Sequence, residues 1–202
     1  MNQPTRKRGR PASIDKPTAL AAMVELFRSK GFDAVSLDDL SDVTGLSRPS
    51  LYRAFGNKIS MYLAAMDAFG AQVGIEAAPI LRGGDDLETS LAGFYDAMLN
   101  IYFRDPDISP GCLVFATAPS SAEIEVIQSR LNFGIEQLDA LMRHRFKEAA
   151  PLASRDQIET AVQLAANTLI AFSARAKSGA MKSGLSDMGQ RSAEFIGRVL
   201  GL

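Results

Sequence analysis

Apolar residues recur three and four positions apart along almost the whole chain, which is the spacing of a helix with one buried face. No stretch alternates apolar and polar residues over the length of a strand. Residues that favour helix starts and stops divide the pattern into segments. The predicted helices cover residues 15–29, 36–45, 47–56, 58–78, 86–103, 112–118, 120–148, 154–177 and 186–200. The sequence therefore predicts an all-α fold.

Two short helices have the clearest boundaries in the chain. Ser36 and Asp39 have the spacing of a capping box at the start of the first helix, and Gly45 suits its end. Ser47 is placed to cap the second helix, whose first turn holds Pro49, where a missing N–H costs little. Two short helices joined by a tight turn indicate a helix-turn-helix.

The second of these helices has the chemistry of a DNA reader. Leu51 and Phe55 lie four residues apart and face inward together, so Arg48 and Ser50 are left on other faces. The N-terminal turn of such a helix enters the major groove first. An arginine there donates to O6 and N7 of guanine, while serine tolerates several base edges. The alternative is an ordinary helical hairpin with solvated charges.

Residues 31–66, GFDAVSLDDLSDVTGLSRPSLYRAFGNKISMYLAAM, resemble the DNA-binding region of the TetR/AcrR family of bacterial regulators. The resemblance is carried by Gly31, Phe32, Ser36, Leu40, Gly45, Leu46, Ser47, Leu51, Tyr52, Phe55 and Lys58. It implies an all-helical homodimer, in which an N-terminal three-helix unit with the helix-turn-helix precedes a divergent C-terminal domain for ligand binding and dimerisation.

The same resemblance implies which side chains contact DNA. Arg48, Pro49, Ser50 and Tyr52 fall where family members contact bases or backbone. Ser36 and Lys58 fall where they touch phosphate, and Ser47 at the helix start joins the candidate set.

Positive charge is concentrated near the N-terminus. Residues 1–58 hold ten Lys or Arg and six Asp or Glu, whereas residues 59–202 hold twelve and seventeen. Residues 1–13 are predicted to be a disordered basic arm, in which Arg8-Gly9-Arg10-Pro11 resembles the core of an AT-hook. Either Arg8 and Arg10 enter a narrow A/T-rich minor groove, or the arm gives unspecific attraction to phosphate.

The C-terminal two thirds are rich in aromatic residues and methionine at helical spacing, which suggests an apolar effector cavity between helices. The candidate effector contacts are Phe94, Tyr95, Met98, Tyr102, Cys112, Phe115, Met142 and Phe172. The alternative is an ordinary core, because such residues usually pack. Cys112 follows Pro110-Gly111 at a helix start, which favours a reactive thiolate, but the apolar residues after it favour a buried, inert thiol.

Some family members carry a Gly-Cys-Leu at this place and sense electrophiles or oxidants through the thiol. With a single Cys in the chain, such a response would be an adduct, a sulfenic acid or a bridge between subunits.

The composition argues against an enzyme. One His and one Cys cannot form a metal site of the usual kind, so no metal and no cofactor is expected. The only histidine, His144, lies in an amphipathic helix and is expected to be solvated. A basic N-terminus without a following apolar stretch, one Cys and no long apolar run predict a cytoplasmic protein without a membrane segment.

The last two predicted helices carry apolar stripes that suggest a dimer interface. The stripes are Ile158, Val162, Ala165, Leu169 and Phe172 in one helix, and Met188, Phe195, Ile196, Val199 and Leu200 in the other. Two such helices from each subunit would form a four-helix interface. The alternative is that both stripes are buried within one chain.

Together these patterns predict a basic arm over residues 1–13, a helix-turn-helix DNA-binding domain over 14–58 and a helical effector-binding and dimerisation domain over 59–202. We expect a dimeric repressor that binds an inverted-repeat operator and is released by a small molecule or a thiol-reactive compound. The alternative function is an architectural DNA-binding protein without an effector.

Overall fold

The computed structural model describes residues 15–84, 86–104 and 111–202, and within these ranges it contains helices and no strand. The N-terminal helices are α1 (Lys16–Ala34), α2 (Leu37–Thr44) and α3 (Arg48–Phe55). After them come α4 (Lys58–Glu76), α5 (Ala78–Leu81), α6 (Leu87–Tyr102), α7 (Leu113–Thr117), the 3-10 turn η1 (Ala118–Ser121), α8 (Glu125–Ala149), α9 (Arg155–Lys177) and α10 (Lys182–Leu200). The predicted all-α fold is confirmed.

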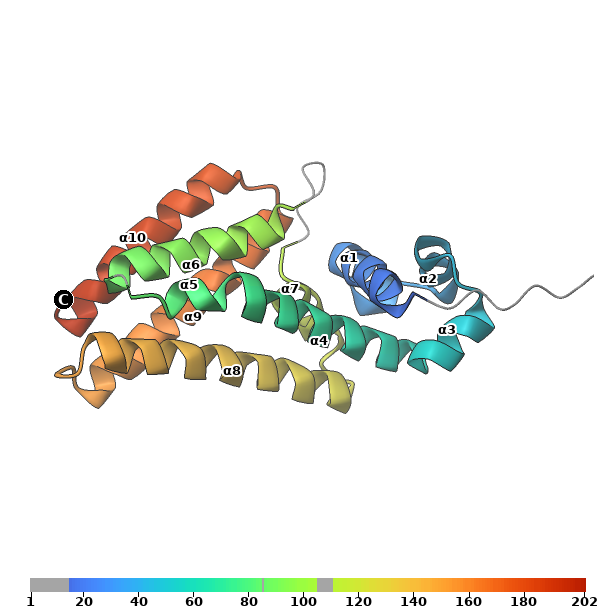
Figure 1. Ribbon diagram of the computed structural model, residues 1–202, viewed down its shortest axis with the longest axis horizontal. Helices are drawn as coiled ribbons and strands as arrows, with labels where there is room; N and C mark the ends of the chain where they lie inside the picture. The colour runs from blue at the N-terminus through green and yellow to red at the C-terminus, as the bar shows by residue number, and fades with distance from the viewer. Residues whose placement is uncertain (1–14, 85, 105–110) are drawn as a thin grey trace, which may run out of the picture.

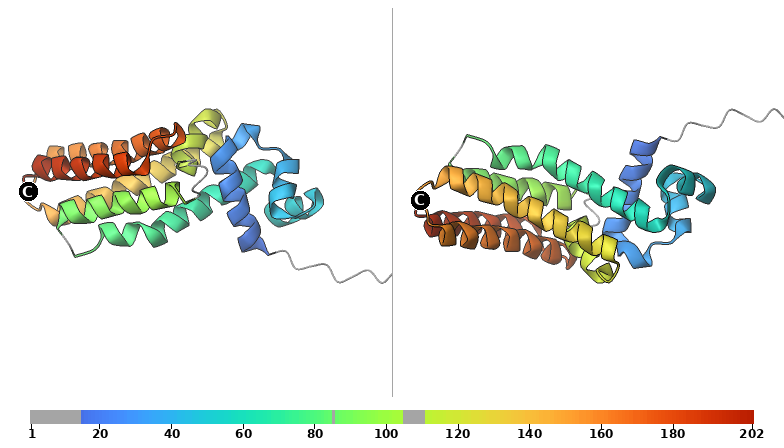
Figure 2. Two further views of the ribbon diagram at one scale, coloured as in Figure 1. Left: turned by 90° about the horizontal axis from the view of Figure 1, so that it is seen from above. Right: turned by 90° about the horizontal axis from the view of Figure 1, so that it is seen from below.

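The helices form two connected parts. Figure 1 shows α1, α2 and α3 gathered at one end, while the C-terminus lies at the far end of an elongated bundle. Helix α4 begins beside α3 and runs into the bundle, so a single helix belongs to both parts. In both views of Figure 2, the long helices of the bundle run along its length, and α10 packs on α6 and α9.

The predicted boundaries of the two short helices are confirmed. The Asp39 N–H donates to Ser36 Oγ at 3.0 Å, and the Ser36 N–H donates to the Asp39 carboxylate at 2.8 Å, which completes the capping box. Hydrogen bonds from Lys30 and Ser36 hold the pKa of Asp39 well below its usual value. Gly45 ends α2 with a φ of 67°, a conformation that favours glycine.

Two predicted helix starts in the bundle are wrong. Helix α8 begins at Glu125, not at Ser120 or Ser121, because both serines belong to the 3-10 turn η1 and Ser121 Oγ donates to Asp33 at 2.9 Å. The last helix, α10, begins four residues before the predicted Ser186. The Ser186 hydroxyl donates across to Asp96 of α6 at 2.6 Å, so it joins two helices instead of capping one.

The apolar stripe predicted on α9 lies inside the chain. All five of its members are buried: Ile158, Val162, Ala165, Leu169 and Phe172. On α10, Ile196 and Leu200 are also buried, whereas Phe195 is 51% exposed. The alternative of burial within one chain therefore holds for the α9 stripe and for part of the α10 stripe.

Candidate DNA-binding face and effector cavity

The N-terminal turn of α3 faces solvent. Leu51 is fully buried, whereas Arg48, Pro49 and Tyr52 are exposed and Ser50 is half-buried. Ser47 begins the helix, but its hydroxyl donates to Ser50 Oγ at 3.0 Å and makes no cap to a backbone N–H. The sequence therefore placed the inward and outward faces of α3 correctly, while the side-chain cap at Ser47 is wrong.

The Arg48 guanidinium is held by α2. Its Nε and Nη2 donate to Asp38 Oδ1 at 2.8 and 2.5 Å, and this hydrogen bond raises the pKa of Arg48. Both side chains are more than half exposed, so the pair is weak and open to exchange. A base edge would have to compete with Asp38 for the same donors.

Two further candidates sit where helices begin. Ser36 caps α2, and Lys58 is the first residue of α4, directly after the cap residue Asn57. Lys58 Nζ donates to the Asp33 carbonyl at 3.3 Å and lies 4.5 Å from the Phe32 ring centroid. These contacts fix the direction of the ammonium group beside a helix N-terminus, which is a favourable setting for phosphate. The other two candidates, Arg8 and Arg10, lie outside the described residues.

A cavity of about 410 Å³ lies between α4, α5, α6, α7, α8 and α9. Four of the predicted effector contacts line it, namely Phe94, Met98, Cys112 and Phe115. The other four, Tyr95, Tyr102, Met142 and Phe172, are fully buried but do not line its wall. Tyr95 and Phe172 pack edge-on with ring centroids 5.5 Å apart, so they belong to the core beside the cavity.

Residues of α4 and α8 outside the predicted set of effector contacts complete the wall. Phe69, Gly70 and Gly74 line it from α4, and Phe133 and Gly134 line it from α8. A Cβ added at Gly70 or Gly74 would meet nothing within 4 Å, so both glycines leave open space. The two glycines in the middle of a long helix were the available signal, because glycine there costs about 1 kcal/mol relative to alanine.

The cavity wall is mainly apolar, and its polar groups are few. The charged groups include an ion pair between α8 and α4, in which Arg130 lies 2.7 Å from Asp67. Arg82 and Gln137 are the other long polar side chains that reach the wall. An apolar pocket with a few polar groups suits a small organic ligand.

Cys112 contributes to this wall as a buried thiol. It begins α7, and the Phe115 N–H donates to its sulfur at 3.5 Å. Burial nevertheless raises the pKa of the Cys112 thiol, because desolvation outweighs that hydrogen bond. The raised pKa favours the packing interpretation over the reactive one.

The described residues hold no group of three or more His, Cys, Asp or Glu side chains with the arrangement of a metal site. None of the described helices is long and apolar enough to cross a membrane. His144 lies 3.4 Å from Glu148 on the exposed side of α8.

Comparison with known proteins places the N-terminal helices in one family. Residues 19–65 match the family described as bacterial regulatory proteins, tetR family. The transcriptional repressor ComR of Escherichia coli K12 is 31% identical over 124 residues, which cover 59% of each chain. The repressor BdcR of the same strain is 40% identical over 74 residues, or 37% of this chain and 38% of BdcR. The matches thus span less than two thirds of either relative's length.

Most of the chain shares the fold of a solved regulator. A cysteine mutant of CifR, a TetR family transcriptional regulator complexed with 26-bp double-strand operator DNA, aligns with a TM-score of 0.81 at 24% identity. The alignment covers 92% of this chain and 98% of CifR. As expected from the composition, these relatives are named as regulators and not as enzymes. Residues 19–65 therefore match the tetR family of bacterial regulatory proteins, and the described part of the chain has the fold of the regulator CifR.

Proposed function

We propose that this protein is a transcriptional repressor that binds an inverted-repeat operator as a homodimer and is released by a small apolar effector. Residues 14–58 read the DNA, residues 59–202 hold the effector and form the dimer, and residues 1–13 add contacts from a basic arm. Repression is proposed by analogy with ComR and BdcR, which are both repressors.

The observation that carries the proposal is the exposed first turn of α3. Arg48, Pro49 and Tyr52 project from a short helix whose opposite face is anchored by the fully buried Leu51. A helix that presents polar groups at its N-terminal turn has the geometry for the major groove. Operator DNA bound to CifR, which has the same fold, supports this partner.

The cavity supports an effector that is apolar and of modest size. Its volume of about 410 Å³ lies within the range of small-molecule sites. The wall offers aromatic and aliphatic contacts, and Arg82 and Gln137 provide the polar contacts for one end of a ligand. Because the Cys112 thiol is buried, we propose non-covalent binding over thiol modification as the release signal.

The exposed side of α9 and α10 supports the proposed dimer. Phe195 is 51% exposed and Ile170 is 41% exposed, although both helices otherwise direct their apolar side chains inward. Large apolar side chains on the outer faces of two adjacent helices suit an isologous interface. Gly189 and Gly197 do not contribute to it, because a Cβ at either would touch α6 or α9 side chains of the same chain.

Footprinting on the DNA upstream of the protein's own gene tests the proposal. We expect protection of a defined inverted repeat, with two half-sites about one helical turn apart or a multiple of it. Equal protection along all DNA tested would contradict this function and favour the architectural alternative. No binding to any duplex would refute both.

We predict that Phe195→Glu produces monomers with operator affinity reduced about a hundredfold or more, because a lone half-site loses the gain from bivalent binding. A charge placed in an apolar interface is strongly disfavoured. Sedimentation measures the assembly state, and Leu152→Glu serves as the control because Leu152 is 99% exposed outside these helices. An intact Phe195→Glu dimer would move the interface elsewhere.

A further inference from the structure

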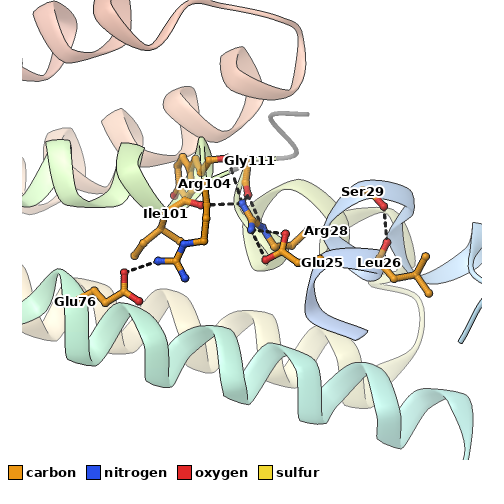
Figure 3. A network of polar contacts seen from close by, with 9 residues as sticks. Glu25, Leu26, Arg28, Ser29, Glu76, Ile101, Arg104 and Gly111 are labelled. Carbon is orange, nitrogen blue, oxygen red and sulfur yellow. Dashed lines mark hydrogen bonds and ion pairs between the residues drawn. The ribbon is translucent and has the colours of Figure 1, made fainter. Parts of the chain in front are cut away.

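Arg28 is a fully buried arginine that belongs to the DNA-binding part but makes most of its contacts in the bundle. It lies on α1, where 1% of the residue is exposed. Its Nε and Nη2 donate to the Gly111 carbonyl, both at 3.1 Å, and Nη2 also donates to the carbonyls of Ile101 and Tyr102 at 3.1 and 3.3 Å. Nη1 donates to both Glu25 carboxylate oxygens at 2.8 Å (Figure 3).

The acceptors of Arg28 explain why an arginine is suited to this position. Ile101 and Tyr102 are the last two residues of α6, so their carbonyls have no partner within that helix. The C-terminal end of a helix carries partial negative charge, which a cation stabilises. The guanidinium group is planar and always charged, and it satisfies several carbonyls at once, whereas a lysine offers a single ammonium group.

A second cation completes a junction of three helix ends. Gly31 interrupts α1 with a φ of 78°, close to the Arg28 carbonyl. That carbonyl accepts a hydrogen bond from Lys177 Nζ at 3.1 Å, in the last turn of α9. The junction therefore ties α1 to the ends of both α6 and α9. We call Arg28, Ile101, Tyr102, Gly111 and Lys177 the Arg28 junction.

Three of the segments that contact Arg28 also contribute to the cavity wall. The Phe69 ring centroid is 5.5 Å from Arg28 Cζ, and Phe69 lines the cavity from α4. Met98 lines it one turn before Ile101 on α6, and Cys112 lines it directly after Gly111. A ligand that moves any of these three wall residues acts on a direct neighbour of the guanidinium group.

The Gly111–Cys112 segment leaves little room for such movement to be absorbed. The Cys112 N–H donates to Ser173 Oγ at 3.0 Å, which attaches the segment to α9. A Cβ added at Gly111 would lie 2.6 Å from the Ser173 carbonyl oxygen, so the two backbones are already in close contact. Packed contacts of this kind shift between discrete arrangements and do not deform continuously.

We infer that Arg28 is a positioning residue: it fixes the orientation of the DNA-binding helices and transmits the occupancy of the cavity to them. This inference rests on the proposed function of a regulator with an effector site. Under this inference, Arg28 itself contacts neither the DNA nor the effector. The ordinary explanation is that Arg28 only stabilises the fold. The two explanations differ in whether a substitution at Arg28 changes the effect that a substitution in the cavity has on operator affinity.

The test uses Gly134→Phe as an internal substitute for the effector. Gly134 lines the cavity on α8, and an added Cβ would lie 3.6 Å from a Val114 methyl carbon, which is an ordinary contact. A phenylalanine there places its ring in the cavity and favours the helix more than glycine does. Operator affinity is then measured for the wild type, Gly134→Phe, Arg28→Met and the double variant.

We expect Gly134→Phe to weaken operator binding about tenfold in the wild type, as typical coupling energies allow. In the Arg28→Met background the same substitution should change affinity by less than about twofold. Arg28→Lys, which keeps the charge without the planar group, should retain part of the coupling and provides a second variant if Arg28→Met folds poorly. Effects of equal size in all backgrounds would overturn the inference.

Arg145→Met is the matched control. Arg145 is a second buried arginine at a helix end, with Nε donating to the Leu81 carbonyl at 2.9 Å, but it joins α8 to α5 within the bundle. Its substitution should cost comparable stability and leave the full effect of Gly134→Phe. Loss of the effect in this variant too would assign Arg28 a purely structural role.

A failure of the proposed function can be distinguished from a failure of this inference, because the wild type itself would then bind no operator. Operator binding that is unaffected by Gly134→Phe in the wild type would refute both the inference and effector release, while leaving DNA binding intact.

Discussion

The candidate DNA-binding face and the cavity of the bundle differ in how their residues come together. The candidate DNA contacts between Ser36 and Lys58 are close in sequence and mostly exposed, and each depends on a helix start that the sequence specifies locally. The cavity wall consists of residues from six helices between Met66 and Leu169, and most of these residues are apolar. A local site is therefore tolerant of changes elsewhere, whereas an assembled site depends on how whole helices approach one another.

Two glycines with left-handed backbones allow this difference to be tested directly. Gly45 ends α2 with nothing within 4 Å of an added Cβ, whereas at Gly111 a Cβ would lie 2.6 Å from the Ser173 carbonyl oxygen. Gly45→Ala should cost about 1–2 kcal/mol of unfolding free energy, from the backbone conformation alone. Gly111→Ala should cost on the order of 3–5 kcal/mol, because a backbone overlap is added to that strain.

Urea unfolding of both variants measures these costs. Equal losses would mean that α9 moves away from Gly111 easily, and the assembled site would then be as tolerant as the local one.

The next largest effect concerns DNA recognition. Arg48→Ala should cost about 1–3 kcal/mol on the operator and relax the preference at one base pair. Lys58→Ala should weaken binding to all sequences alike and reduce the salt dependence. Titrations against the operator and single-base variants at two salt concentrations separate these outcomes. If Arg48→Ala behaved like Lys58→Ala, Arg48 would be a phosphate contact that merely leaves Asp38 on binding.

The smallest effect is expected at Cys112. Since burial raises the pKa of its thiol, the group is protonated at neutral pH and should react with an electrophile more slowly than the same thiol in the unfolded chain. Operator binding by the wild type and by Cys112→Ser should respond alike to the reagent. If the reagent released only the wild type from the operator, the thiol would be a sensor.

The same raised pKa has a consequence for stability. The folded state favours the protonated thiol, so the stabilising contribution is complete below the ordinary thiol pKa and declines as the pH rises above about 8.5. The difference in unfolding free energy between the wild type and Cys112→Ser should therefore shrink between neutral and alkaline pH.

The sequence was sufficient for features determined by neighbours in the chain. Ser36 with Asp39, Gly45 and the inward face at Leu51 follow from local capping and periodicity, and the structure confirms all three. The sequence was insufficient where a side chain has a distant partner. Ser186 was expected to cap a helix because nothing local reveals that its hydroxyl meets Asp96, ninety residues earlier.

The same reason limits prediction of the cavity. Periodicity identifies which face of a helix is buried, but it does not distinguish a packed core from the wall of a void. Met98 lines the cavity while Met142 is buried away from it, although both looked equivalent in sequence. Arg28 gave no signal at all, because one arginine in an amphipathic helix is normally solvated.

The length of helix α4 determines how far a small tilt moves its ends. Its 19 residues make a rod about 28 Å long, with Met66 to Gly74 along the cavity and Lys58 next to α3. A tilt of about 5° around the cavity end would displace the other end by about 2.5 Å. Hydrogen bonds to base edges are lost over much smaller distances. In the proposed function, α4 would therefore act as a lever, because a tilt too small to disturb the bundle would displace its α3 end far enough to end base recognition.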